Sequence, residues 1–275
     1  MPQWLLDLLM GPFFLLGNLI WNFFMMMTVS LLTTDPEAFS GDAWTLVEST
    51  LFPLFLSIGI ACLNIFALTG FLREIANIKE NLTLEALILM LVRLMVANVI
   101  IVNLISFVRI FFGMATALTG LVLPGNLLEL RTMEASGSNL LFMFLFGVFF
   151  LIIAIVAGGM ITLAVFSRYL KIFMHVAVGP IAIATLGGDR SLAQAGFSWI
   201  KTFLSYNFEI VVIGMALTLG SAVARGVDWG MGTGVFAELA TEGLLYPILT
   251  LFQMIIIAGA VKGADVFMKR GFALG

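Results

Sequence analysis

The chain has 275 residues, of which 61% are hydrophobic and 11% are charged, and its formal net charge at pH 7 is −3. Soluble globular domains carry about 25% charged residues, so this chain cannot cover a water-facing surface and lipid must be its main solvent. The net charge gives no basic field for general nucleic-acid binding, and the single cysteine excludes an internal disulfide or a cysteine-based metal cluster. We therefore expect an all-α, polytopic helical membrane protein with interfacial helices.

The first apolar stretch, residues 11–32, is long enough to cross a bilayer, which takes roughly 20 apolar residues. The start, MPQWLLDLLM, has no basic residue before its apolar run, which argues against a cleavable signal peptide. Residues 11–32 contain no Lys or Arg, so hydropathy alone predicts a span with its N-terminus inside. Asn18 and Asn22 lie one helical turn apart, which suits a helix–helix hydrogen bond or a partly hydrated lining.

Five further apolar stretches follow the acidic turn TTDPEAFSGD, and each is expected to span the membrane. They are residues 47–72, 84–107, 140–166, 203–223 and 244–261. The second of these continues apolar to residue 123, and one helix of that length would be about 60 Å long, twice the hydrocarbon thickness. We therefore expect a span and then an interfacial helix that ends at Pro124-Gly125. The chain divides into an N-terminal apolar segment with an outer acidic loop, residues 1–46, and a polytopic core, residues 47–275.

Lys and Arg are unevenly distributed between alternate loops, and this asymmetry predicts the orientation. Nine of them lie in loops 73–83 and 167–202 and in the C-terminal tail, whereas the opposite loops hold only Arg131 and Arg225. The asymmetry places the C-terminus and the loop 167–202 in the cytoplasm. The expected location is therefore the cytoplasmic (inner) membrane, crossed several times.

The segment KIFMHVAVGPIAIATLGGDR is too short to cross a bilayer and too apolar for an ordinary soluble loop. Arg168, Lys171 and His175 recur at helical spacing, which predicts an amphipathic helix at the cytoplasmic interface. Gly179 and Pro180 should then bend the chain, because proline removes a backbone donor and glycine relaxes the steric limits. We expect an interfacial elbow that joins two spans and could contact soluble partners.

Several polar residues lie within the apolar stretches. Arg93 and Glu209 are at similar shallow depths from the cytoplasmic face, and a central arginine costs roughly 2.5–3.5 kcal/mol on insertion scales. The two could form an ion pair or line a passage, and the alternative is that each extends to the lipid headgroups. Asn98 and Asn103 are more typical of helix–helix contacts than of ion ligands. His175 is more typical of a headgroup or interhelix contact than of a proton relay.

The sequence contains no recognisable catalytic motif. One His, one Cys and scattered carboxylates do not form the patterns of a metal site or a nucleophilic triad. The segment GFSWIKT lacks the glycine that precedes the lysine of a phosphate-binding loop. We therefore expect neither an enzyme nor a bound cofactor or metal ion.

The stretches SRYLKIFMHVAVGPIAIATLGG and FLSYNFEIVVIGMALTLGSAV, joined by a cytoplasmic link, resemble the core of the TrbL-type polytopic proteins of type IV secretion and conjugation systems. The resemblance covers about residues 45–270 and is most specific at Val178-Gly179-Pro180-Ile181. The strongly apolar N-terminus differs from the amphipathic outer segment typical of that family.

The resemblance implies a structural channel or scaffold subunit of an inner-membrane complex that transfers DNA and protein during conjugation. Its implied partners are membrane lipid, cytoplasmic ATPases, and pilin-like or stalk subunits. It also implies transient contact with the transferred single-stranded DNA and a ring-like homo-oligomer.

The alternative is a small-solute permease or the membrane subunit of a transporter. Such a protein would show a convergent set of buried polar groups, or a helix broken by Gly or Pro, near the middle of the membrane. Here the Gly179-Pro180 break is expected at the interface, and Arg93 is the clearest deep polar residue. This pattern favours the scaffold. An intramembrane enzyme is disfavoured by the missing motifs.

Overall fold

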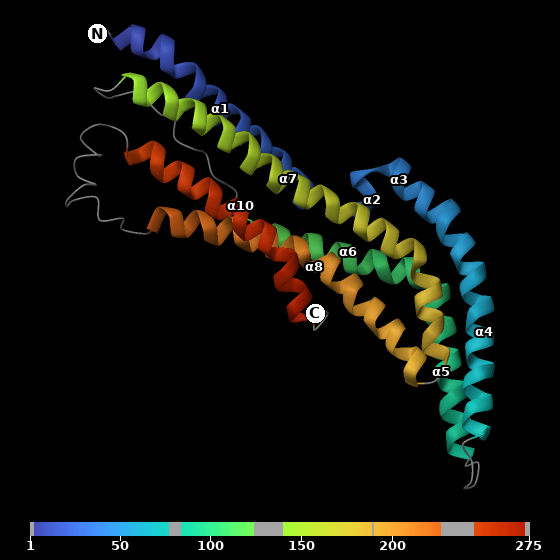
Figure 1. Ribbon diagram of the computed structural model, residues 1–275. Helices are drawn as coiled ribbons and strands as arrows, with labels where there is room; N and C mark the ends of the chain where they lie inside the picture. The colour runs from blue at the N-terminus through green and yellow to red at the C-terminus, as the bar shows by residue number, and fades with distance from the viewer. Residues whose placement is uncertain (1–2, 77–83, 124–139, 189, 227–244, 273–275) are drawn as a thin grey trace. The chain divides into compact units, whose positions relative to one another are not determined.

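The computed structural model describes residues 3–76, 84–123, 140–188, 190–226 and 245–272, and every regular element within them is a helix (Figure 1). In chain order the elements are α1 (Gln3–Leu32), α2 (Pro36–Phe39), α3 (Gly41–Leu46), η1 (Val47–Leu51), α4 (Phe52–Ala76), α5 (Leu84–Val102), α6 (Leu104–Val122), α7 (Leu140–Ala184), η2 (Thr185–Gly187), α8 (Arg190–Gly226) and α10 (Leu245–Gly271). The element η1 is a π-helix and η2 is a 3₁₀ helix.

Six helical stretches in the described part of the chain are long and apolar enough to cross a membrane. They are Pro12–Leu32, Gly41–Arg73, Leu104–Val122, Phe144–Gly187, Ser191–Val223 and Ile248–Gly271. Their length and composition confirm an all-α, polytopic membrane fold. The expected N-terminal sixth span is among them.

The third apolar stretch divides at Asn103 rather than near residue 107. The long apolar helix there is Leu104–Val122, and Ile88–Val102 is a shorter one. The side chain of Asn103 donates a hydrogen bond from Nδ2 to the carbonyl of Val99, at 2.9 Å. Because this bond shares its acceptor with the backbone ladder, it weakens the helix locally and explains the interruption.

The helices cluster into two compact units. The first unit consists of Met1–Thr33, Leu118–Ser167 and Ile210–Val266, and the second of Thr34–Ala117, Arg168–Glu209 and Phe267–Gly275. Each unit therefore combines segments that are far apart in the sequence. The division expected between residues 46 and 47 lies inside the second unit, where α3 continues directly into η1.

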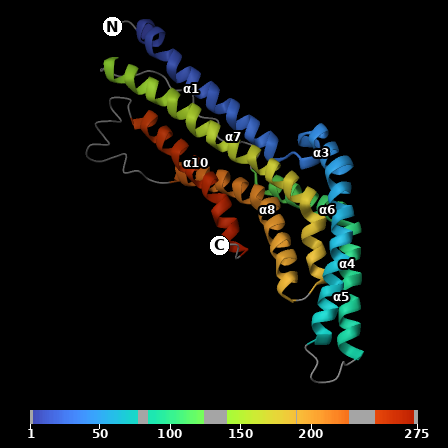
Figure 2. The ribbon, with the colours of Figure 1, turned by 45° about the vertical axis from the view of Figure 1, so that its right-hand side comes forward.

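In the first unit, α1 lies beside the first part of α7 (Figure 2). A Cβ at Gly17 would lie 2.6 Å from Cδ1 of Phe150, and a Cβ at Gly158 would lie 2.7 Å from Cδ2 of Phe24. Each glycine thus leaves room for a phenylalanine ring of the other helix. Small residues at such an interface allow two helices to pack closely within a membrane.

The contacts between α1 and α7 advance in the same direction along both helices. Gly17 meets Phe150, and further along Thr28 Oγ1 lies 3.0 Å from Thr162 Oγ1. The two helices are therefore parallel, and parallel helices that cross a bilayer cross it in the same direction. The sequence pattern places the N-terminal end of residues 11–32 and the loop that follows residues 140–166 both in the cytoplasm, so it predicts that these two stretches are antiparallel. This prediction is wrong.

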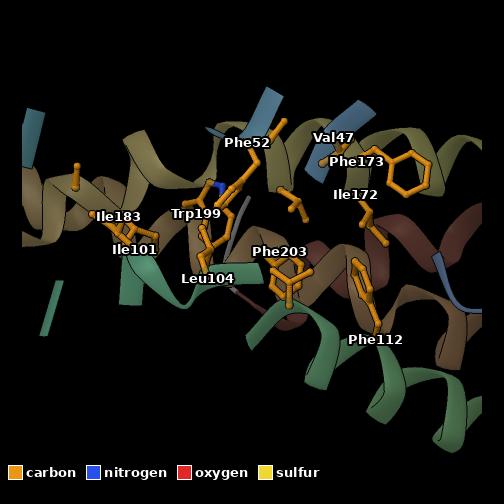
Figure 3. Packing of buried hydrophobic residues seen from close by; sticks show 14 of the residues in the cluster. Val47, Phe52, Ile101, Leu104, Phe112, Ile172, Phe173, Ile183, Trp199 and Phe203 are labelled. Carbon is orange, nitrogen blue, oxygen red and sulfur yellow. The ribbon is translucent and has the colours of Figure 1, made fainter. Parts of the chain in front are cut away.

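In the second unit, a buried hydrophobic cluster joins α3, η1 and the helices from α4 to α8 (Figure 3). The ring of Trp44 lies 5.8 Å from that of Phe112 and 6.1 Å from that of Phe173, and Phe112 lies 6.2 Å from Phe203. Aromatic rings at these separations attract one another in addition to the apolar area they bury. The cluster therefore fixes the helices that carry the polar residues described below.

The helix α7 does not end at Gly179-Pro180, as expected for an elbow, but continues to Ala184. A Cβ at Gly179 would lie 2.7 Å from Cδ2 of Leu104 and 2.8 Å from Cζ2 of Trp199. The glycine therefore serves close packing, because it lets α6 and α8 approach α7.

Pro180 likewise lies at a close helix contact. A Cβ at Gly59 of α4 would lie 2.8 Å from the carbonyl oxygen of Pro180. The proline removes one helical hydrogen bond, but packing against α4 holds the helix in place around it. The chain turns later, at η2 and the extended residue Gly188.

Candidate functional site

The candidate site is a polar junction in the second unit, formed by Arg168, Asn207 and Glu209 with two backbone carbonyls. Arg168, on α7, is completely buried. Its Nε donates to the carbonyl of Tyr206 at 2.9 Å, and its Nη2 donates to the carbonyl of Asn207 at 3.3 Å. Both carbonyls belong to α8, so the planar guanidinium fastens α7 to α8 through two neighbouring acceptors.

Glu209 compensates the buried charge of Arg168. Its side chain is 3% exposed, and its carboxylate attracts the guanidinium electrostatically. Nη1 of Arg168 has no hydrogen-bond partner among the described residues, so the hydrogen bonds alone do not satisfy the cation. A buried charge requires an opposite charge nearby, and Glu209 supplies it.

Asn207 extends the junction to a third helix. Its side chain is completely buried, and its Nδ2 donates to the carbonyl of Phe111 on α6 at 2.7 Å. Its own carbonyl accepts the hydrogen bond from Arg168. One residue of α8 therefore links α6 and α7.

His175 and Trp199 form a second polar contact between α7 and α8, with a hydrogen bond in each direction. Trp199 Nε1 donates to the carbonyl of His175 at 3.1 Å, and His175 Nε2 lies 3.1 Å from the carbonyl of Trp199. A carbonyl only accepts, so the proton of the neutral imidazole is on Nε2. The two rings are stacked at 5.0 Å with an interplanar angle of 4°. This His175–Trp199 pair fixes the two helices side by side.

The structure brings Arg168, Lys171 and His175 to the side of α7 that faces α8. Lys171 Nζ lies 5.5 Å from the centre of the Tyr206 ring, within the range of a cation–π contact. The three basic residues therefore contact protein in this structure. Sequence reasoning identified their common face but missed Asn207 and the α8 carbonyls, which carry no pattern of their own.

Arg93 and Glu209 are not brought together. Arg93 is exposed on α5, whereas Glu209 is buried on α8 and attracts Arg168 electrostatically. The four asparagines expected at helix–helix contacts differ in their burial. Asn18 is buried, whereas Asn22, Asn98 and Asn103 are exposed.

Sequence reasoning missed a charged cluster around Arg109 of α6. Its Nε donates to Glu37 Oε1 at 2.7 Å, and its Nη2 donates to Glu48 Oε1 at 2.8 Å. The side chains of Arg109, Glu37 and Glu48 are 45%, 34% and 38% exposed, so each pair contributes at most about 1 kcal/mol. The cluster joins α2 and η1 to α6. The sequence offered two features from which this cluster could have been predicted. One is a single arginine within an apolar helix, and the other is the acidic turn TTDPEAFSGD.

The described residues hold no group of three or more His, Cys, Asp or Glu side chains that could bind a metal ion. Fold and site together define a polytopic helical membrane protein whose second unit is joined by buried interhelical hydrogen bonds. No family model, curated protein or solved structure matches the chain.

Proposed function

We propose that this protein is a structural channel or scaffold subunit of the inner-membrane complex of a conjugative type IV secretion system. In this role it supports DNA and protein translocation and assembly of a pilus or stalk. The observation that carries the proposal is the polar junction, in which Arg168 and Asn207 donate to carbonyls of neighbouring helices. Such bonds fix the relative positions of helices, which is what a scaffold requires.

The same observation argues against a small-solute permease. A permease must bind and release its solute, so it needs deep polar groups that are available to that solute. In the second unit, Arg168, Asn207 and His175 instead bond to the protein backbone. These side chains stabilise the packing of α6, α7 and α8.

The charge distribution supports an orientation in the cytoplasmic membrane. Arg190 lies at the turn between α7 and α8, at the start of α8. Lys262, Lys269 and Arg270 lie in the last part of the chain, in α10. By the positive-inside rule the turn and the C-terminus are cytoplasmic. Secretion ATPases would meet the protein there, and pilin-like or stalk subunits on the other side.

A transfer assay tests the proposal. The gene is deleted from a donor strain that carries the conjugative element, and the strain is complemented with wild-type protein, Arg168→Gln or Arg93→Gln. We expect deletion to abolish transconjugants, wild type to restore them and Arg168→Gln to restore few. Arg93→Gln is the matched control, because it removes the same charge from an exposed site, and it should restore transfer.

Co-purification gives the second measurement. A secretion ATPase should purify with the complementing protein from detergent-solubilised membranes. Normal transfer in the deletion strain would contradict the proposal. If deletion instead abolished uptake of a small solute, the permease would be the correct alternative.

A further inference from the structure

The helix α1 has two different faces. One face is buried in the first unit, where the glycine–phenylalanine contacts hold α1 against α7. Its buried residues recur at helical spacing and are Phe14, Gly17, Asn18, Trp21, Met25, Thr28 and Leu32. The opposite face makes no such contact and is exposed.

Within residues 12–32, for which the side chains of α1 are described, the most exposed large hydrophobic side chains form one line along the helix. Leu15, Leu19 and Met26 are 64%, 59% and 69% exposed, more than any other large hydrophobic side chain in that range. Asn22, which is also exposed, lies between the last two. The four residues are separated by steps of four, three and four residues, the spacing of a heptad seam through which parallel helices pack. We call Leu15, Leu19, Asn22 and Met26 the α1 seam.

Asn22 is the unusual member of the α1 seam. It lies at the middle of the apolar stretch Pro12–Leu32, which contains no charged residue. Its amide has two N–H donors and one carbonyl acceptor, and it makes no hydrogen bond to any described residue. In the hydrocarbon of a bilayer there is no water to replace a missing partner, so an exposed amide at this depth is costly.

We propose that the α1 seam is a self-association surface, on which a second copy of this chain packs with its own α1 in parallel. An amide is both donor and acceptor, so Asn22 of one copy complements Asn22 of another at the same depth. Copies of one membrane protein share an orientation, which makes their α1 helices parallel. The apolar residues on either side of Asn22 supply the packing, and the amide selects the register.

The occupant is a second copy rather than lipid, because acyl chains offer no hydrogen-bond partner to an amide. A cationic or acidic partner helix is disfavoured, since the seam carries no charge for it to match. The inference rests on α1 as a membrane span and not on a role in secretion. It can therefore fail or hold independently of the transfer assay.

Disulfide cross-linking in native membranes tests the surface. Cys62 is the only cysteine, so Cys62→Ser gives a background into which single cysteines are placed. Oxidation of Leu19→Cys or Met26→Cys should give a cross-linked dimer of the full-length chain. Leu16→Cys and Met27→Cys are the matched controls, because both positions are exposed on α1 but lie off the seam. They should cross-link several-fold less.

The role of the amide is tested in the Leu19→Cys background. Asn22→Leu should reduce the dimer about three- to five-fold, the effect of losing one interhelical amide hydrogen bond in a membrane. Asn22→Gln should retain most of the dimer. Asn64→Leu, at another exposed asparagine in an apolar helix, should leave it unchanged.

Three results would overturn the proposal. Equal cross-linking on and off the seam would show random collision, and an unchanged dimer with Asn22→Leu would show that the amide has no role. A cross-linked product of another mass would identify a different protein as the occupant. Fluorescence of a C-terminal fusion verifies that every variant is inserted at the wild-type level, so a lost dimer cannot be attributed to lost protein.

Discussion

Arg168 and Arg93 both interrupt apolar helices, but their surroundings give them opposite energetics. Arg168 is fully buried and donates to two α8 carbonyls, whereas Arg93 is exposed. The Glu209 carboxylate attracts the buried Arg168 guanidinium electrostatically. Removal of one of two buried opposite charges leaves the other uncompensated, which typically costs about 3–5 kcal/mol. Replacement of an exposed charge changes the free energy of unfolding little, because water or lipid headgroups solvate that position in both the folded and the unfolded protein.

We therefore expect Arg168→Gln to lower the free energy of unfolding by about 3–5 kcal/mol, measured by SDS titration in mixed micelles. Glu209→Gln should also be destabilising, because it removes the carboxylate next to the buried guanidinium. The double substitution should cost less than the two single losses together. Arg93→Gln, the control, should change stability by no more than about 0.5 kcal/mol. Additive losses from Arg168 and Glu209 would contradict the electrostatic coupling of these two residues.

Gly179 and Gly113 provide a second contrast at the scale of single residues. A Cβ at Gly179 would clash with Leu104 and Trp199, whereas a Cβ at Gly113 would have no atom within 4 Å. Gly179→Ala should therefore lower the free energy of unfolding by roughly 1–3 kcal/mol, the usual effect of overpacking. Gly113→Ala should raise it by up to about 1 kcal/mol, because alanine favours the helix. The same SDS titration measures both, and equal effects would contradict the close packing around Gly179.

At the scale of elements, the His175–Trp199 pair joins α7 to α8 through rings and hydrogen bonds. Trp199 also stacks on Phe203, at 5.6 Å and 4°. Trp199→Phe keeps an aromatic ring but removes the Nε1–H donor to the His175 carbonyl. We expect a loss of roughly 0.5–1.5 kcal/mol in the free energy of unfolding, which is the contribution of one such hydrogen bond.

The partner substitution His175→Phe completes a double-mutant cycle. Because the two side chains interact directly, the double variant should lose less than the two single variants combined. Phe197→Leu is the control, since Phe197 lies on the same helix but is 58% exposed. A coupling energy of zero would show that the two residues act independently.

The cluster around Arg109 predicts local rather than global effects. Arg109 holds Glu37 of α2 and Glu48 of η1, but all three side chains are partly exposed. Arg109→Gln should lower the free energy of unfolding by less than about 1 kcal/mol. It should also make the free energy of unfolding less dependent on salt concentration, because salt screens exposed ion pairs. It should, however, increase amide hydrogen exchange in residues 36–51, because α2 and η1 lose their link to α6. Unchanged exchange there would contradict that link.

The sequence was sufficient for features that depend on composition and length, and insufficient for those that depend on partners. Apolar stretches of about 20 residues identify spans because lipid is their solvent. Gly179-Pro180 was wrongly expected to end a helix, since the contacts with Leu104, Trp199 and Gly59 that hold α7 together are made by other segments. Local propensity contains no information on such contacts.

Polar residues show the same limit. Asn18 and Asn22 are one turn apart, but four residues advance a helix about 40° beyond a full turn. That rotation is enough to place Asn18 at the edge of the buried face and Asn22 on the exposed one. Likewise, only the fold distinguishes buried Arg168 from exposed Arg93, because Glu209 and Asn207 lie about 40 residues away along the chain.

For the whole molecule, the parallel packing of α1 on α7 constrains the topology. If both helices cross the bilayer, their N-terminal ends lie on the same side. The segments between them, which form α4, α5 and α6, must then cross the membrane an odd number of times. The sequence pattern predicts two crossings between α1 and α7, whereas the parallel packing of these helices requires an odd number.

Reporter fusions measure this directly. A reporter fused before residue 1 and another inserted within residues 124–139 should lie on the same side of the membrane, because each precedes one of two parallel helices. Alkaline phosphatase, which is active outside, and a fluorescent protein, which is fluorescent inside, should therefore give matching results at both positions. A third fusion after residue 275 should give the opposite result, since three apolar helices separate it from residues 124–139.

Gly17→Leu is the matched variant: its side chain would collide with Phe150 and release α1 from α7 without adding charge. If the wild-type N-terminal and 124–139 reporters lay on opposite sides, α1 and α7 could not both cross the membrane as packed.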